Sequence, residues 1–135
     1  MLSFKLSSII RDVPDFPKPG ILFKDITPLY ADPGILKECI QEIQVQFKNV
    51  KMDAVAGIEA RGFLTGILLA QALNLPFVPI RKAGKLPADK ISTSYELEYG
   101  TATIEMHKDG IRPGSQVLIH DDVLATGGSA LAASR

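Results

Sequence analysis

The stretch VLIHDDVLATGGS, residues 117–129, decides the fold expected for this chain of 135 residues. Residues 116–120 form an apolar run that predicts a buried strand, and Asp121 and Asp122 follow it directly. Gly127 and Gly128 then lead into an alanine-rich helix that begins near Ala130. Ligands of open parallel sheets bind beyond the carboxyl ends of the strands, so this order of elements predicts a ligand site.

The turn after the two aspartates has the chemistry of a phosphate site. Free N–H groups at a helix N-terminus attract anions, and Gly127 and Gly128 let the backbone approach one closely. Thr126 and Ser129 add hydroxyl donors. Ionised carboxylates only accept hydrogen bonds, so Asp121 and Asp122 suit the 2′- and 3′-hydroxyls of a ribose 5-phosphate. A strand-to-helix turn capped by aspartates is the alternative for a bare Asp-Asp or Thr-Gly-Gly, and the length of the pattern favours the phosphate site.

Upstream of this turn the chain alternates between strand and helix patterns. The expected strands are residues 53–58, 76–80, 95–98 and 102–106, with a helix over residues 62–73 and an exposed loop over residues 82–90. Such an alternation predicts an α/β fold with a central, mainly parallel sheet flanked by helices.

The amino-terminal third contains a short helix pattern, a proline-rich segment and a longer helix pattern. Apolar residues in the segment 2–10 lie on one face of a helix, whereas the prolines of residues 14–20 predict a stiff, extended loop. Asp32 followed by Pro33 is typical of a helix start, and the apolar spacing continues to about Val50.

Composition narrows the function classes. Fifteen basic and fifteen acidic side chains give a net charge of zero, which disfavours a nucleic-acid or membrane-surface partner. No apolar run approaches the roughly 20 residues of a membrane span, and no signal peptide is recognised. The single cysteine, Cys39, cannot form an internal disulfide, so a cytoplasmic protein is expected.

Residues 117–129 resemble the phosphoribosyl pyrophosphate (PRPP) motif of type I phosphoribosyltransferases. His120 stands where the family usually has an aliphatic residue, and Ser129 stands where threonine is common. Four more segments are similar to motifs of the adenine phosphoribosyltransferases, and they come in the family's order. They are PDFPKPGILFKDITPL at 14–29, GIEARGF at 57–63, PIRKAGKLP at 79–87 and YELEYG at 95–100. The resemblance covers nearly the whole chain.

The resemblance implies a fold and a reaction. The expected fold is a single type I phosphoribosyltransferase domain over residues 1–135, with an N-terminal hood segment at 1–30 and a mobile lid at 82–103. The expected reaction in purine salvage converts adenine and PRPP to AMP and pyrophosphate. Mg²⁺ is expected to arrive with PRPP rather than on direct protein ligands, and a homodimer is expected.

The resemblance also implies roles for individual residues. Phe23 stacks on adenine, the backbone of Leu22 reads its Watson–Crick edge, and Lys24 lies near the phosphates. Pyrophosphate is bound by Arg61, Arg81 and Lys85, next to a cis peptide bond between Glu59 and Ala60. The PRPP ribose and 5′-phosphate are bound by Asp121, Asp122, Ala125, Thr126, Gly127, Gly128 and Ser129. In the lid, Glu98 and Tyr99 approach the base and the ribose, where Glu98 exchanges a proton with a purine ring nitrogen.

The end of the sequence leaves alternatives open. Family members usually continue for a further helix and strands, and without these elements an exposed sheet edge or an uncovered apolar face is expected. One alternative is a shortened, non-catalytic variant that keeps nucleotide or phosphate binding, or only a dimer surface. The other is a phosphoribosyltransferase for another base, which the proline-rich segment and Leu97-Glu98-Tyr99-Gly100 disfavour.

Overall fold

The computed structural model describes residues 2–96, 100–122 and 128–134, and the side chains of 128 and 129 are excluded from that description. The chain divides into two compact units, Met1–Gln46 and Phe47–Arg135. The expected hood segment, residues 1–30, lies within the first unit. The strands expected to carry the phosphate chemistry lie within the second.

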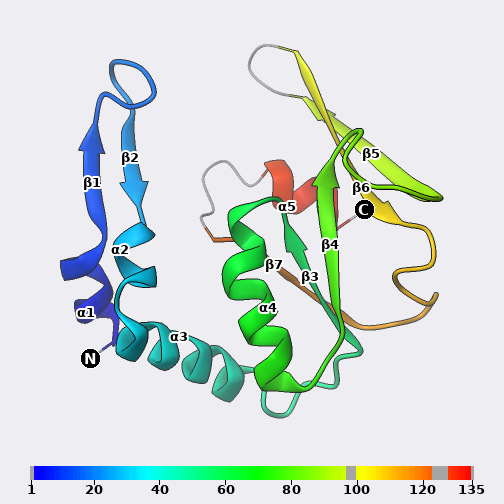
Figure 1. Cartoon of the computed structure of the whole chain (residues 1–135), viewed down its shortest axis with the longest axis horizontal. Coiled ribbons are helices and arrows are strands. Elements are labelled where there is room, and N and C mark those ends of the chain that lie inside the picture. Colours follow the sequence, from blue (N-terminus) through cyan, green and yellow to red (C-terminus); the bar gives the residue numbers. More distant parts are fainter. Residues whose placement is uncertain (1, 97–99, 123–127, 135) are drawn as a thin grey trace. The chain divides into compact units, whose positions relative to one another are not determined.

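The first unit consists of short helices and one hairpin (Figure 1). Its elements are α1 (Leu2–Ile9), β1 (Arg11–Pro14), β2 (Leu22–Asp25), α2 (Thr27–Tyr30) and α3 (Pro33–Gln46). Asp32 Oδ1 accepts a hydrogen bond from the Ile35 N–H at 3.0 Å, so the predicted start of the longer helix is confirmed. That helix ends at Gln46, four residues before the predicted end at Val50, because residues 47–49 form a turn.

The proline-rich segment differs from the extended loop that the sequence predicts. β1 and β2 pair as an antiparallel hairpin, and residues 15–21 connect them. The connection contains a cis Phe16–Pro17 bond, and Asp15 and Gly20 both have positive φ angles, of 56° and 87°. Asp15 Oδ1 accepts a hydrogen bond from the Gly20 N–H at 2.9 Å, which closes the turn. The turn is therefore defined by backbone conformation, which apolar periodicity does not report.

The second unit is built on a five-stranded mixed sheet with the order β5-β6-β4-β3-β7. Its elements are β3 (Ala54–Ile58), α4 (Arg61–Leu73), β4 (Phe77–Lys82), β5 (Lys90–Glu96), β6 (Thr101–His107), β7 (Val117–His120) and α5 (Gly128–Ala133). β4, β3 and β7 are parallel neighbours, whereas β6 runs antiparallel to both β4 and β5. The predicted α/β fold is confirmed, and β5 begins five residues before the predicted Tyr95.

Helices α4 and α5 pack against opposite faces of this sheet. Ala54, Ala56 and Ile58 of β3 belong to one buried cluster with Ala132 of α5. Gly57, which points to the other face because side chains alternate along a strand, lies against α4. A Cβ added at Gly57 would lie 2.9 Å from the Gly62 carbonyl oxygen, so the helix and the strand touch backbone to backbone. No described helix is long and apolar enough to cross a bilayer.

Candidate active site at the carboxyl ends of three strands

The parallel strands β4, β3 and β7 end at the same edge of the sheet and bring polar residues together there. Residues 59–61 follow β3, Arg81 and Lys82 end β4, and Asp121 and Asp122 follow β7. The chain leaves β3 through α4 to reach β4 on one side, whereas β7 lies on the other side of β3. Such a switch in connection direction opens a crevice at the carboxyl ends of the strands, where α/β proteins bind ligands.

Arg61 and Asp122 bridge this crevice from α4 to the end of β7. Arg61 Nε lies 3.0 Å from Asp122 Oδ2, and the Asp122 side chain is only 3% exposed. Asp121 Oδ1 accepts a hydrogen bond from the Asp122 N–H at 2.8 Å. A Cβ at Gly62 would lie 3.2 Å from the His120 carbonyl oxygen and 3.3 Å from Asp121 Oδ1. The first turn of α4 therefore lies directly against the acid pair, and glycine at position 62 makes this approach possible.

Asp121 ionises less readily than an ordinary aspartate. Burial raises the pKa of Asp121 to about 6, and the side chain of Asp122 adds to this by a hydrogen bond and by its charge. The Asp122 N–H and the Arg61 guanidinium act in the opposite direction without cancelling the effect. Two carboxylates at one site resist a second negative charge, so Asp121 holds its proton to a higher pH than an ordinary aspartate.

A second buried carboxylate, Glu59, lies among the cations at the end of β4. Its side chain is 9% exposed, with Oε2 lying 3.4 Å from Arg81 Nε and Oε1 lying 3.8 Å from Lys85 Nζ. Glu59 Oε2 also accepts a hydrogen bond from the Lys82 N–H at 2.6 Å. Burial alone would raise the pKa of Glu59, but the Lys82 N–H and the two cations outweigh burial and lower it. Glu59 is therefore an ionised partner of these cations.

The structure thus places all three predicted pyrophosphate cations at one edge of the sheet, each beside a buried carboxylate. Arg61 pairs with Asp122, whereas Arg81 and Lys85 share Glu59. The peptide bond between Glu59 and Ala60 is cis, as the resemblance predicts. Sequence reasoning used Glu59 only to locate that bond and missed its carboxylate. Its position at the end of a predicted strand, two residues before Arg61, could have indicated a role for this carboxylate beside the cations.

His120 packs against α4 instead of pointing into the crevice. His120 Nε2 lies 2.6 Å from Thr65 Oγ1, within hydrogen-bonding distance. Burial lowers the pKa of His120, and the charge of Asp122 only partly opposes this. His120 is therefore held as a neutral packing residue between β7 and α4, in agreement with its place at the end of the strand predicted over residues 116–120.

The predicted adenine residues all lie on β2, in the first unit. Phe23 packs edge-to-face with Phe16, with ring centroids 5.2 Å apart. Leu22 is 53% exposed, and Lys24 Nζ lies 2.6 Å from Asp12 Oδ1 on the paired strand. A partly buried aromatic ring in an edge-to-face contact is suited to stack on a flat, apolar ligand such as a purine.

Several predicted site residues lie outside the described part of the chain. Glu98 and Tyr99 fall between β5 and β6, and Ala125, Thr126 and Gly127 fall between β7 and α5. Gly128 and Ser129 begin α5, and their side chains are not described. The predicted lid, residues 82–103, includes β5 and the first residues of β6, and these strands pair antiparallel.

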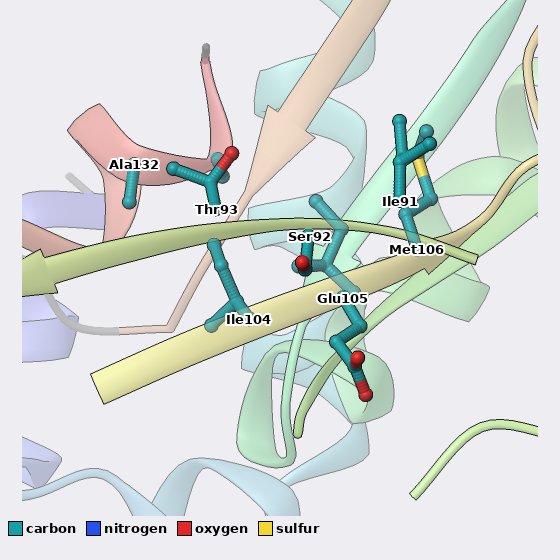
Figure 2. Close-up of a pocket in the computed structure, with 9 residues that line it drawn as sticks. Ile91, Ser92, Thr93, Ile104, Glu105, Met106 and Ala132 are labelled. Atoms are coloured by element: carbon teal, nitrogen blue, oxygen red, sulfur yellow. The ribbon is translucent and has the colours of Figure 1, made fainter. Parts of the chain in front are cut away.

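Two cavities in the second unit lie away from the polar edge. One, of about 160 Å³, is lined mainly by apolar residues of β5, β6 and α5 (Figure 2). Figure 2 shows the Glu105 carboxylate directed to the opposite side of its strand from Ile91 and Met106. The other, of about 480 Å³, lies beside Asp53, Pro76 and Ser115, which precede the parallel strands. Neither is lined by a described residue of the predicted site.

Comparisons with known proteins agree with this geometry. Residues 26–135 match the family model described as a phosphoribosyl transferase domain. The adenine phosphoribosyltransferase of Halothermothrix orenii is 57% identical over 129 residues, which are 96% of this chain and 76% of that protein. This chain therefore spans about three quarters of the length of such relatives.

Solved structures give the same family. The adenine phosphoribosyltransferase of Rhodothermus marinus has a TM-score of 0.91 and 53% identity, covering 98% of this chain and 75% of that one. The Saccharomyces cerevisiae enzyme, solved with an imino-altritol bisphosphate and adenine, has a TM-score of 0.93 and 44% identity. That match covers 98% of this chain and 78% of the yeast chain.

Proposed function

Since this chain belongs to the adenine phosphoribosyltransferases of the type I phosphoribosyltransferase family, we propose that it joins adenine to PRPP in purine salvage. The products are AMP and pyrophosphate. The observation that carries this proposal is the gathering of Asp121, Asp122, Arg61, Arg81 and Lys85 at one edge of the sheet.

The acid pair receives the ribose of PRPP. Asp121 and Asp122 accept hydrogen bonds from the 2′- and 3′-hydroxyls, which supply the donors that two carboxylates need. Their negative charge also stabilises the positive charge that develops at the anomeric carbon as the bond to pyrophosphate breaks. The 5′-phosphate lies against residues 125–129, whose amides and hydroxyls are the donors proposed from the sequence.

The cations receive the pyrophosphate. Guanidinium groups match phosphate oxygens in shape and charge, so Arg61 and Arg81 suit the leaving group, with Lys85 as a third positive charge. Arg61 is already paired with Asp122. Binding of PRPP therefore separates this ion pair. Asp122 then binds the ribose diol, and Arg61 binds the pyrophosphate.

The hairpin of the first unit receives adenine. Phe23 stacks on the purine and the backbone of Leu22 reads its Watson–Crick edge, while Lys24 serves the phosphates. The lid of residues 82–103 excludes water from the positive anomeric centre, and Glu98 and Tyr99 approach the base and the ribose. Glu98 exchanges a proton with a ring nitrogen of the base as N9 attacks.

Mg²⁺ is the proposed cofactor, carried by PRPP. The described residues contain no group of three or more histidine, cysteine, aspartate or glutamate side chains that could hold a metal ion. Mg²⁺ usually keeps several waters and takes oxygen ligands from substrate phosphates, so a dedicated protein cage is not required. When bound, the ion neutralises pyrophosphate charge. A cytoplasmic homodimer completes the proposal.

The direct test measures AMP formation from adenine and PRPP by the purified 135-residue chain. Asp122→Asn is expected to lower kcat/KM by about 100-fold, because it removes an acceptor that acts in the transition state. Asp109→Asn, on an exposed loop after β6, is the matched control and is expected to retain activity.

Two outcomes would replace this proposal with the alternatives. A cooperatively folded chain that makes no AMP would favour a non-catalytic variant. Faster turnover with hypoxanthine, guanine or orotate than with adenine would assign a different base.

A further inference from the structure

We propose that Glu59 is the positioning residue of the pyrophosphate subsite: its carboxylate fixes Arg81, Lys85 and the Lys82 backbone before pyrophosphate arrives. The inference rests on the proposed function, because it assigns a further residue to the subsite of Arg81 and Lys85. It concerns a residue that would act through its neighbours and would not touch the reacting atoms.

Glu59 joins β3 to β4 with both its backbone and its side chain. The last paired residues of the two strands are Ile58 and Ile80. Beyond them, the Glu59 N–H donates to the Ile80 carbonyl oxygen at 2.8 Å. The Lys82 N–H then donates to Glu59 Oε2 at 2.6 Å. The side chain thus continues the ladder where the backbone of β3 turns away, and it fixes the point at which the chain leaves β4.

Arg81 is held on two sides by this arrangement. Its Nε lies 3.4 Å from Glu59 Oε2, and its guanidinium carbon lies 6.0 Å from the centre of the Phe63 ring. Phe63 is itself fixed by an edge-to-face contact with Phe77, with centroids 5.8 Å apart. A guanidinium held by a carboxylate and by an aromatic face has few other orientations, so the direction of its fork is set in advance.

The charges leave the subsite positive. Two carboxylates, Glu59 and the neighbouring Glu105, stand against three cations, Arg81, Lys82 and Lys85, so an anion is still attracted. The Glu59 side chain is 9% exposed, whereas Arg81 and Lys85 are 34% and 53% exposed. The carboxylate is buried and the cations reach solvent. Glu59 can therefore hold the cations in place while they remain accessible to an anion.

Two substitutions separate the charge of Glu59 from its hydrogen bond. Glu59→Gln keeps an oxygen that accepts from the Lys82 N–H but removes the negative charge. Glu59→Ala removes both and leaves that N–H without its partner. Glu105→Gln is the matched control, since Glu105 is also 9% exposed and accepts a hydrogen bond from the Gly84 N–H at 2.8 Å. No ion pair involves Glu105 among the residues that the structure describes.

The measurements are pyrophosphate binding by calorimetry at fixed salt, and the KM values for PRPP and for adenine. Glu59→Ala is expected to weaken pyrophosphate binding and to raise KM for PRPP, each by about tenfold. KM for adenine is expected to stay unchanged. Glu59→Gln is expected to lose less pyrophosphate affinity than Glu59→Ala but more than Glu105→Gln, and it decides the question if Glu59→Ala does not fold.

Amide hydrogen exchange at Lys82 gives a readout that does not depend on catalysis. Exchange is expected to accelerate in Glu59→Ala and to stay slow in Glu59→Gln, because only the former lacks the acceptor. A wild-type chain that binds pyrophosphate but makes no AMP would sink the proposed function and leave this inference standing.

Three results would overturn the inference. The first is unchanged or tighter pyrophosphate binding in both Glu59 variants, which would make Glu59 a competitor of the ligand. The second is an equal loss of pyrophosphate affinity in Glu105→Gln. The third is a parallel rise of both KM values, which would indicate a general structural defect.

Discussion

At the carboxyl edge of the sheet, two buried carboxylates pair with the cations before any ligand binds. Asp122 is 3% exposed and Glu59 is 9% exposed, and both lie within ion-pair distance of arginine side chains. Buried carboxylates stay ionised only when cations or N–H donors compensate the lost water. The resting site is thus internally paired, and substrate binding exchanges these partners for substrate groups.

The raised pKa of Asp121 predicts a pH dependence of stability. The pKa is about 6 in the folded chain and 3.8 in the unfolded reference, so the folded state binds more protons between these values. The contribution of Asp121 to the free energy of unfolding therefore falls as pH rises from about 4 to about 6. Urea denaturation at a series of pH values checks this. Asp121→Asn is expected to lack this fall, and identical pH profiles for the two proteins would contradict the prediction.

The contact between Thr65 and His120 predicts a measurable coupling between α4 and β7. Thr65→Val should lower the free energy of unfolding by about 1–3 kcal/mol, because the half-buried imidazole loses a partner at 2.6 Å. In a double-mutant cycle with His120→Leu, the losses should be less than additive by about 1 kcal/mol. Thr103→Val removes an exposed hydroxyl pair with Ser94 and serves as control, with an expected change below about 0.5 kcal/mol. If the two losses of unfolding free energy were additive, Thr65 and His120 would not be coupled, and the prediction would be wrong.

At the scale of elements, α4 is fixed to the sheet by positions that have no side chain. Added Cβ atoms at Gly57 and Gly66 would lie 2.6 Å and 2.8 Å from atoms of the Phe77 ring. Such distances lie well inside van der Waals contact, so α4 lies close to β3 only because both positions are glycine. This close packing sets the place of the first turn of α4, and therefore of Arg61.

Gly57→Ala tests this packing. The new methyl group would meet the Phe77 ring and the Gly62 carbonyl oxygen at once, and a backbone atom cannot rotate away. The free energy of unfolding is expected to fall by about 1–3 kcal/mol, as for other overpacked interiors. In Gly34→Ala, at the start of α3, the nearest atom is Asp32 Oδ1 at 3.4 Å. That variant should be stabilised by up to about 1 kcal/mol through helix propensity. Circular dichroism during urea unfolding measures both.

The elements differ in how well the sequence predicts them. Apolar periodicity located β3, α4, β4 and β7 within a few residues, because each carries apolar residues that are buried or half-buried against the sheet. β5 has almost no buried residues, so Lys90 to Ser94 give no apolar signal and the strand was predicted to begin at Tyr95. The β1–β2 hairpin was missed because prolines at its turn mask the pairing of residues 11–14 with 22–25. The helix α2 was missed because four residues are too few to show a helical period.

At the scale of the whole molecule, the resemblance to a family supplied what local patterns could not. The three cations and the acid pair are spread from position 61 to position 122, and only the parallel order β4-β3-β7 brings them together. The contacts of Glu59 with Lys82 and Lys85, and of Thr65 with His120, join residues 23 to 55 positions apart. No local pattern encodes such contacts, so the supporting residues stayed unpredicted. The roles of Glu98, Tyr99 and residues 125–127 stay predictions.

The prediction for the assembly is a homodimer. Leu64, Ile67 and Leu68 of α4 are 52%, 52% and 43% exposed, and exposed apolar side chains favour association. Sedimentation velocity is expected to give a mass twice that of one chain at micromolar concentration. A single-chain mass at that concentration would contradict the expectation.

The two faces of α4 have a consequence for how this sequence can diverge. The inward side has glycines at which a methyl group would press on neighbouring atoms, whereas Leu64, Ile67 and Leu68 on the outward side are about half exposed. Substitutions along this helix should therefore act in a periodic way: those at 62 and 66 should destabilise the fold, whereas those at 64, 67 and 68 should change association more than folding. In related sequences, the positions of α4 that face the sheet should then vary less than those on its outward side.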